Sequence, residues 1–424
     1  MLSSVRRQAA VLVATVAVFS LGLSALGTSG ASAQTTPGVT SNSVKLGLLA
    51  DLTGPLASSF GGVAQGAQAR IDQQNASGGV YGRKIQLAVG DDQSNPNDAL
   101  TVTQGLVQQQ GIFSLMAESA FFTLVYKYLG QQQIPTVSGQ PYDGGPEWAD
   151  PSSHDLVDGA GAQNPNTPNL GWEWLIKILK ADKITKLATL ANGFSAASVA
   201  YANGIKAAAE AAGIQVVDED NSLTETQTDL TPNAITMKKS GANGWVGLTS
   251  LFSEQALMTA LHQQGATNIK AVLLGQYAGA LLQPPLNSID QGTIVPFYYK
   301  TPEISPAVGG QLVAALRKYT GYKGGSPPPN LGYYFGWASA QIAITGLQAA
   351  GKNLTVNSYL NGLHKQAAYT AGGLQVPVNL AQIKQGTYAP AAAGNCEYAL
   401  KVSGTKFVPL STQPYCTPTD FYKQ

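Results

Sequence analysis

The sequence lacks an excess of either charge. It contains 25 basic and 24 acidic residues among 424, and charged residues make up only 12% of the chain. No basic patch or stripe is present, so the sequence gives no support for binding to nucleic acid. Glycine, alanine, glutamine and asparagine are frequent instead. This composition is typical of a globular protein exported to an aqueous compartment, and not of a disordered chain.

Histidine is scarce, and the common catalytic motifs are missing. For each of the three histidines, His154, His262 and His364, a structural or solvated role is favoured over a catalytic one. The stretch 193–197 lacks the last glycine of a Gly-x-Ser-x-Gly elbow, and there is no His-Glu-x-x-His motif, Walker loop or cysteine nucleophile pattern. We therefore expect no enzyme; a secreted hydrolase with an untypical site remains a remote alternative, testable with ester and peptide substrates.

Cysteine is nearly absent as well. The two cysteines, Cys396 and Cys416, are 20 positions apart. In an oxidising compartment such a pair is a candidate disulfide, which would stabilise the C-terminal part by roughly 3 kcal/mol on the loop-entropy model. Two lone cysteines do not form a metal site, so we expect no metal and no cofactor.

Long hydrophobic runs are confined to the N-terminus. Residues 1–33 read as a signal peptide: Arg6 and Arg7 precede an apolar stretch, and Ala31-Ser32-Ala33 forms a small-residue cleavage site. A membrane anchor is the alternative, but the apolar stretch is short and no charged stop follows it. The paired arginines resemble a twin-arginine signal only weakly, so we expect ordinary secretion. No cysteine lies near the cleavage site for a lipid anchor, and no later apolar run reaches the ~18 residues of a spanning helix. The mature protein should be soluble and extracytoplasmic.

After a flexible leader at 34–43, apolar strands alternate with helices. Continuous apolar runs such as VKLGLLA are expected of strands that are buried on both faces. The expected strands are 44–50, 84–92, 111–117 and 134–139, and the expected helices are 62–76, 95–110 and 122–133. This βαβ alternation predicts a parallel, doubly wound sheet.

A second series of the same kind follows a Gly-, Pro-, Asp- and Asn-rich segment at 139–169, which we interpret as a crossing between two halves. The expected helices are 171–182, 198–213, 230–241, 253–265 (with Ser253 as its cap), 304–320 and 332–350, and the expected strands are 186–192, 214–220, 244–250, 269–275 and 293–299. Two α/β halves predict a protein of two lobes, each built on a doubly wound parallel sheet.

Hydroxyl, amide and aromatic side chains recur directly after these strands. In doubly wound sheets, ligands bind outside the carboxyl ends of the strands. Serine and threonine at a helix start are often only caps, but here the pattern recurs in five loops, which favours a pocket for a small molecule. The loops are 53–60, 118–121, 138–142, 192–195 and 276–277.

The run at 44–99 resembles the N-terminal lobe of extracytoplasmic solute-binding proteins of the leucine/isoleucine/valine-binding type. It contains the Thr53-Gly54 turn, the N-x-x-G-G-V-x-G-R ending of a helix at 75–83, the pair Asp91-Asp92 and a helix start at Asn95-Pro96. The later elements follow the same order. The resemblance implies a type I periplasmic binding fold, with two lobes joined by three hinge crossings near residues 158, 292 and 371. It divides the mature chain into lobe 1 at 44–158 and 293–370 and lobe 2 at 159–292 and 371–424.

The resemblance also implies a ligand site between the lobes. Ser119 and Gln140, with the backbone amides beside them, take the positions that hold a ligand carboxylate in the family. Phe60 takes the place of an aromatic ring that packs on the ligand, and Phe194 that of an aromatic from the second lobe. Tyr142 lies in the loop of Gln140. We expect Ser119→Ala and Phe60→Ala to weaken binding without unfolding the protein.

One position departs from the pattern of the amino-acid binders. Where they present an acidic residue to the ligand ammonium, this chain has Gln276, followed by Tyr277. A buried ammonium needs a paired charge, which a glutamine does not provide. Either Glu118 or Asp143 supplies the charge from the other lobe, or the ligand has no α-ammonium and is an amide, a urea-like compound or an aromatic acid. Alternatively, Glu118 is only a solvated carboxylate in its loop.

The expected partners are a small-molecule solute and an ABC permease that reads the closed form; a monomer is expected. A sensor accessory of the same fold is the alternative, and gene neighbours would distinguish the two. We expect one group of aromatic residues to pack in the core or between the lobes. This group comprises Trp172, Trp174, Trp245, Trp337, Tyr298, Tyr299, Tyr333 and Tyr334. For the four tyrosines, a place in the pocket wall is the alternative to core packing.

Overall fold

The computed structural model describes residues 36–139, 147, 150, 156–158, 171–224, 227–325, 327–328, 330–382 and 396–417. Four residues that the sequence analysis singled out lie outside this part of the chain: Gln140, Tyr142, Asp143 and His154. The predicted signal peptide lies outside it as well. No helix within the described ranges combines the length and the apolar character that a membrane crossing requires.

The first lobe is built on a parallel sheet with the strand order β2-β1-β3-β4-β5. Strand β1 lies between β2 and β3 and is largely buried on both faces, as the apolar run VKLGLLA predicted. The strands are β1 (Ser43–Ala50), β2 (Lys84–Asp91), β3 (Ser114–Glu118), β4 (Thr136–Ser138) and β5 (Leu156–Asp158). The expectation of a parallel sheet in this half is confirmed.

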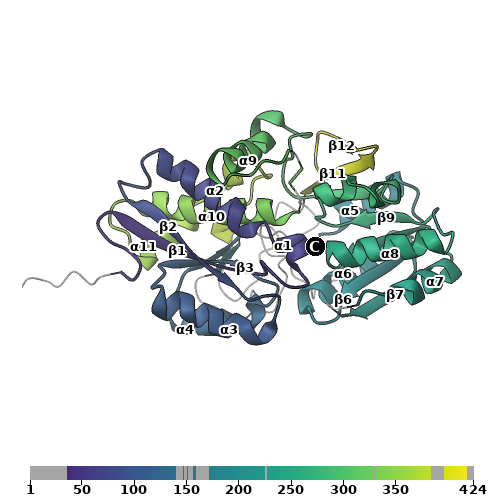
Figure 1. Cartoon of the computed structure of the whole chain (residues 1–424), viewed down its shortest axis with the longest axis horizontal. Helices are drawn as coiled ribbons and strands as arrows, with labels where there is room; N and C mark the ends of the chain where they lie inside the picture. Colours follow the sequence, from purple (N-terminus) through teal and green to yellow (C-terminus); the bar gives the residue numbers. More distant parts are fainter. Residues whose placement is uncertain are drawn as a thin grey trace, which may run out of the picture. The chain divides into compact units, whose positions relative to one another are not determined.

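Helices cover both faces of this sheet. Figure 1 shows α3 and α4 on one face and α2 and α10 on the other. The helical segments are α1 (Ala57–Phe60), α2 (Val63–Ala76), α3 (Pro96–Gln104) with the π turn η1 (Gly105–Gln109), η2 (Phe122–Leu124), α4 (Tyr126–Gln131), α9 (Pro306–Tyr319), α10 (Gly332–Ala350) and α11 (Val356–Leu363). Helices α2 and α10 pack closely because Gly336 has no side chain: a Cβ there would lie 1.8 Å from the carbonyl oxygen of Val63.

The second lobe repeats the strand order of the first and extends it. Its strands β7-β6-β8-β9-β10 are parallel, and β11 and β12 add an antiparallel edge beside β10. The strands are β6 (Lys186–Asn192), β7 (Gln215–Leu223), β8 (Gly244–Leu248), β9 (Lys270–Leu273), β10 (Ile294–Phe297), β11 (Cys396–Ser403), β12 (Lys406–Pro409) and β13 (Tyr415–Cys416). In both lobes the order reverses beside the first strand, at the point where doubly wound sheets bind ligands.

The rest of the chain forms further helical segments. For one of them, α8, the predicted N-terminal cap is wrong. The cap of α8 is Ser250, whose hydroxyl accepts the N–H of Ser253 at 3.3 Å; Ser253 itself lies within the first turn. The segments are α5 (Glu173–Ala181), α6 (Ala196–Ala211), α7 (Thr231–Ser240), α8 (Leu251–Gln263), η4 (Gly279–Leu282), η5 (Leu286–Ser288), η6 (Ala371–Gly373) and η7 (Leu380–Gln382).

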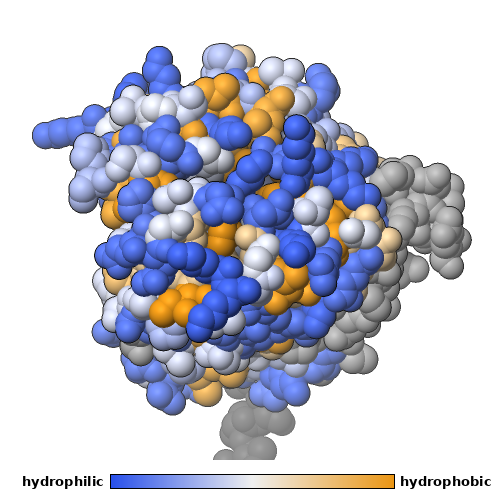
Figure 2. Space-filling model, turned by 90° about the vertical axis from the view of Figure 1, so that its right-hand side faces the viewer, coloured by the Kyte–Doolittle hydropathy of each residue, from blue (hydrophilic) through white to orange (hydrophobic). Residues whose placement is uncertain are grey.

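Large aromatic side chains fill the cores. Trp172, Trp174, Trp245 and Trp337 are all buried, and so are Tyr298, Tyr299, Tyr333 and Tyr334, as the core interpretation predicted. The largest apolar cluster includes residues of both sheets. On the face shown in Figure 2, hydrophilic residues predominate and hydrophobic ones form small separate groups.

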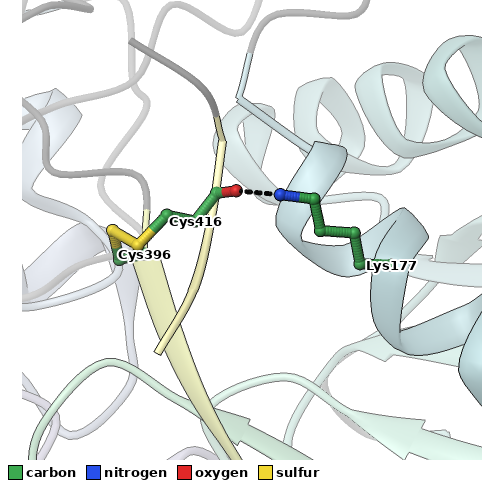
Figure 3. The surroundings of a disulfide bond; sticks show 3 residues. All are labelled: Lys177, Cys396 and Cys416. Carbon is green, nitrogen blue, oxygen red and sulfur yellow. Dashed lines mark hydrogen bonds between the residues drawn. A yellow bond between two sulfur atoms is a disulfide. The ribbon is translucent and has the colours of Figure 1, made fainter. Parts of the chain in front are cut away.

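The predicted disulfide is present. It joins Cys396 at the start of β11 to Cys416 in β13, which pairs antiparallel with β11. The Lys177 Nζ of α5 donates a hydrogen bond of 2.6 Å to the carbonyl oxygen of Cys416 (Figure 3). The disulfide and this bond together fasten the C-terminal strand to the second lobe.

Reduction of this disulfide should destabilise the protein. The bond closes a loop of about 20 residues, so its loss should lower the free energy of unfolding by about 3 kcal/mol on the loop-entropy model. Urea denaturation with and without dithiothreitol measures the difference. The double variant Cys396→Ser/Cys416→Ser is the control, because its stability should not respond to the reductant. Equal curves for the oxidised and reduced protein would contradict the expectation.

Candidate ligand-binding site

A cavity of about 330 Å³ lies at the carboxyl ends of the strands of both sheets. The first lobe contributes the loops after β1 and β3 and the start of α10, and the second contributes the loops after β6, β8 and β9. The lining residues are Leu56, Ser59, Phe60, Pro96, Ser119, Ala120, Phe121, Phe122, Thr123, Leu124, Glu147, Asn192, Phe194, Ser195, Ala196, Ala197, Ser198, Tyr201, Leu248, Thr249, Ser250, Leu274, Gln276, Leu331 and Phe335. The topology thus brings four of the five predicted loops to one place.

Aromatic rings form much of the wall. The ring centroids of Phe60 and Phe335 lie 6.1 Å apart. Those of Phe121 and Phe194 lie 6.2 Å apart, and these two rings are inclined by 32°. Tyr201 of α6 adds a further ring from the second lobe. Phe60 and Phe194, which the resemblance assigned to the ligand site, therefore lie in the cavity wall.

The two lobes touch across the cavity. The backbone N–H of Leu251, at the start of α8, donates to the hydroxyl of Ser59 in α1 at 3.3 Å. The ring pair of Phe121 and Phe194 forms a second contact between the lobes. Phe194 is still 37% exposed, so its ring lies partly in solvent. Residues of both lobes would thus surround a molecule in the cavity.

Gln276 follows β9 and is buried in the cavity wall with 3% of its surface exposed. Its Nε2 donates to the carbonyl oxygen of Thr249 at 3.2 Å, which fixes the orientation of the amide. Its Oε1 is buried and has no hydrogen-bond partner among the described residues. A buried acceptor without a donor is costly, so a ligand that donates to it would be favoured.

Ser119 also lines the cavity, but its hydrogen bonds are directed inward. Its hydroxyl donates to Oδ2 of Asp92 and accepts the N–H of Phe121 at 3.0 Å. The N–H of Ala120 donates to Oδ2 of Asp51 at 2.8 Å. Burial raises the pKa of Asp92, although the hydrogen bonds from Ser119 and Asp51 oppose the rise. Two of the donors that the resemblance assigned to a ligand carboxylate, the hydroxyl of Ser119 and the N–H of Ala120, are thus already paired with carboxylates of the chain.

The structure changes the expectation for Ser119→Ala. Because the hydroxyl donates to a fully buried carboxylate, its loss should lower the free energy of unfolding near neutral pH by about 1–3 kcal/mol. Chemical denaturation measures the effect, with Ser77→Ala on the exposed end of α2 as the control. If the Ser119→Ala variant is as stable as the control but binds solute more weakly, the hydroxyl of Ser119 contacts the ligand directly.

Two of the predicted site residues lie outside the cavity. Glu118 is fully buried, accepts the N–H of Gly139 at 3.0 Å and accepts the hydroxyl of Ser339, so it is not a solvated loop carboxylate either. Tyr277 is buried in the core, where its hydroxyl donates to Oε2 of Glu303 at 2.7 Å.

Several lining residues were not predicted. Ser59 and Phe121 belong to loops that the sequence analysis singled out, so the pattern pointed to their neighbourhood. Tyr201 and Phe335 lie within helices whose apolar residues predict only core packing. Phe335 reaches the cavity because α10 packs against α1 at Gly332, where a Cβ would lie 2.8 Å from the carbonyl oxygen of Phe60. Of the described histidines, neither His262 nor His364 lines the cavity.

The comparisons with known proteins agree with this architecture. The family model "Periplasmic binding protein" matches residues 43–387. A Leu/Ile/Val-binding protein, BraC3, of Rhizobium johnstonii is 36% identical over 64 residues, which are 15% of this chain and 17% of that protein. The chain thus matches less than a fifth of the length of this curated relative.

Solved structures match over nearly the whole chain. A fatty acid ABC transporter substrate-binding protein from Thermomonospora curvata has a TM-score of 0.72 at 20% identity, covering 90% of this chain and 95% of that one. A branched-chain amino acid ABC transporter structure from Thermus thermophilus with bound valine has a TM-score of 0.70 at 17% identity, covering 90% and 99%. A solute-binding protein from R. palustris in complex with benzoate has a TM-score of 0.69 at 18% identity, covering 89% and 98%.

The fold and the family match define the class. The chain has the type I periplasmic binding fold, with two α/β lobes. It belongs to the periplasmic binding protein family, whose model matches residues 43–387.

Proposed function

We propose that the protein captures a small solute in the cavity between its lobes and delivers it to an ABC permease. The observation that carries this proposal is the cavity itself, which the equivalent strand ends of both lobes enclose. Each lobe supplies half of the binding surface. A ligand that contacts both halves favours the arrangement in which the lobes touch, because it binds that arrangement more tightly.

The proposed hinge segments follow from the strand pairing. Since β10 pairs with β9 and β11, residues 294–297 belong to the second sheet, which supports a crossing after β10 in place of the expected boundary at 293. Helix α9 then packs on α2 of the first lobe. The second crossing therefore lies between β10 and α9. The third lies between Leu374 and β11. The carbonyl oxygen of Leu374 accepts the N–H of Lys300. The first lies after β5, as the sequence predicted near residue 158.

In this role the protein catalyses no reaction. After removal of residues 1–33, the mature protein acts outside the cytoplasm as a monomer. The ligand would be a branched-chain amino-acid-like molecule or a related carboxylate or amide. The similar solved structures include one with bound valine, one in complex with benzoate and a fatty acid transporter protein, so the ligand depends on the side chains of the cavity and not on the common fold. Gln276, in place of an acidic residue, favours the amide.

Uptake of a solute tests this function. A library of small solutes is first screened for a rise in the melting temperature of the purified protein. Uptake of the best radiolabelled solute is then measured in the source cells with and without the gene. We expect initial uptake at submicromolar solute to be largely lost without the gene and restored by the unmodified gene. Unchanged uptake, with a bound solute in hand, would favour the sensor alternative over transport.

A further inference from the structure

We infer that the ligand is an uncharged molecule with an apolar body about as large as an aromatic ring and one N–H or O–H group that donates to Oε1 of Gln276. The inference rests on the proposed function and narrows the class of its ligand. It starts from the fixed orientation of the Gln276 amide. With Nε2 on the carbonyl oxygen of Thr249 at 3.2 Å, the reverse orientation would place two acceptors against each other. The acceptor of Gln276 therefore has no donor among the described residues.

The described part of the wall offers a ligand carboxylate no positive charge. No lysine, arginine or histidine is among the described lining residues. Behind Ser119, the carboxyl groups of Asp51 and Asp92 are both fully buried and hydrogen-bonded to each other. These carboxyl groups accept the hydrogen bonds of the Ser119 hydroxyl and the Ala120 N–H. A carboxylate placed there would lack donors and would be repelled by any charge on this pair.

A ligand ammonium is disfavoured for a different reason. The residue after β9 is Gln276, which presents a dipole but no charge. Among the described lining residues the only titratable acid is Glu147, which is buried and already interacts within the chain. Its charge is one of the causes, after burial and the hydrogen bond to Asp150, that raise the pKa of Tyr126. An amino-acid zwitterion would thus leave both of its charges poorly compensated.

The size of the ligand follows from the rings. Phe60 and Phe335 face each other from the first lobe, and Phe121 pairs with Phe194 across the lobes. Leucines close the remaining wall, and a cavity of about 330 Å³ has room for a ring with a short substituent. Aromatic faces favour a flat apolar body over a branched polar one.

Four compounds with one carbon skeleton test the inference by isothermal titration calorimetry. They are 3-phenylpropanamide (neutral), 3-phenylpropanoate (anionic), 3-phenylpropylamine (cationic) and L-phenylalanine (zwitterionic). We expect the amide to bind at least about tenfold more tightly than each of the other three, because only the amide leaves no buried charge without a partner. Tighter binding of any charged compound would overturn the inference and leave the proposed function standing.

Two variants locate the contact. Gln276→Leu removes the acceptor and should weaken binding of the amide about tenfold, the effect of one buried neutral hydrogen bond. Gln283→Leu makes the same change at an exposed site outside the cavity and should leave the affinity unchanged. Equal affinity of Gln276→Leu and the unmodified protein would overturn the contact. If no compound of the set binds while other library solutes stabilise the protein, the inferred ligand class is wrong. If no solute binds at all, both the inferred ligand class and the proposed function are wrong.

Discussion

Replacing Phe60 by alanine is expected to weaken solute binding by about 10- to 100-fold, because the ring supplies a large apolar surface on the ligand side of the cavity. The fold should survive, since Phe60 is only partly buried and ends the short helix α1. Calorimetry with the best solute of the library gives the affinity, and circular dichroism confirms the fold.

Phe252→Ala is the matched control for this change. Phe252 lies in the first turn of α8, is 51% exposed and does not line the cavity. The same truncation there should alter the affinity less than about twofold, within the range of surface substitutions. Similar losses in the two variants would mean that the aromatic wall has no special role in binding.

Asp290→Asn is expected to stabilise the protein near neutral pH by about 3 kcal/mol. Asp290 precedes β10 and is fully buried, and burial raises the pKa of its carboxyl to about 7, against the opposing hydrogen bond from Gln255 at 3.2 Å. Below the ordinary pKa of 3.8 the carboxyl is neutral in both the folded and the unfolded chain, and its contribution to stability is complete. As the pH rises toward 7 the unfolded chain ionises first, so the free energy of unfolding falls.

Asparagine removes this loss, because it does not ionise and can still accept the bond from Gln255. The variant and the unmodified protein should therefore be similar in stability near pH 3.5 and differ most at pH 7–8. Urea denaturation at several pH values measures both curves. Glu210→Gln, on the exposed side of α6, is the control and should leave the curve unchanged. A variant that is less stable than the unmodified protein at every pH would contradict the assigned pKa.

The fold could be predicted from the sequence because it depends on local patterns. The apolar runs at β1 and β6 and the long helix α10 lie within one residue of the predicted bounds. The antiparallel strands β11 and β12 were missed, since no helix lies between them to reveal the alternation.

The site could be predicted only to the level of its loops. That Phe60, Ser119, Phe194 and Gln276 meet follows from the rule that strand ends gather at one edge of a sheet. Which side chain turns toward the cavity depends on packing. Tyr277 turns into the core, and Ser119 turns toward Asp92, a carboxyl that comes from a different strand. No spacing in the sequence shows that these donors are already occupied.

Small-angle X-ray scattering tests the central claim, which is that the lobes close on a solute. The protein is measured alone and saturated with the library solute that gives the largest thermal shift. The account predicts a larger radius of gyration without solute. With solute, the curve should fit the arrangement in which Leu251 contacts Ser59 and Phe121 contacts Phe194. Identical curves at a saturation verified by calorimetry would show that binding involves no closure and would contradict the account.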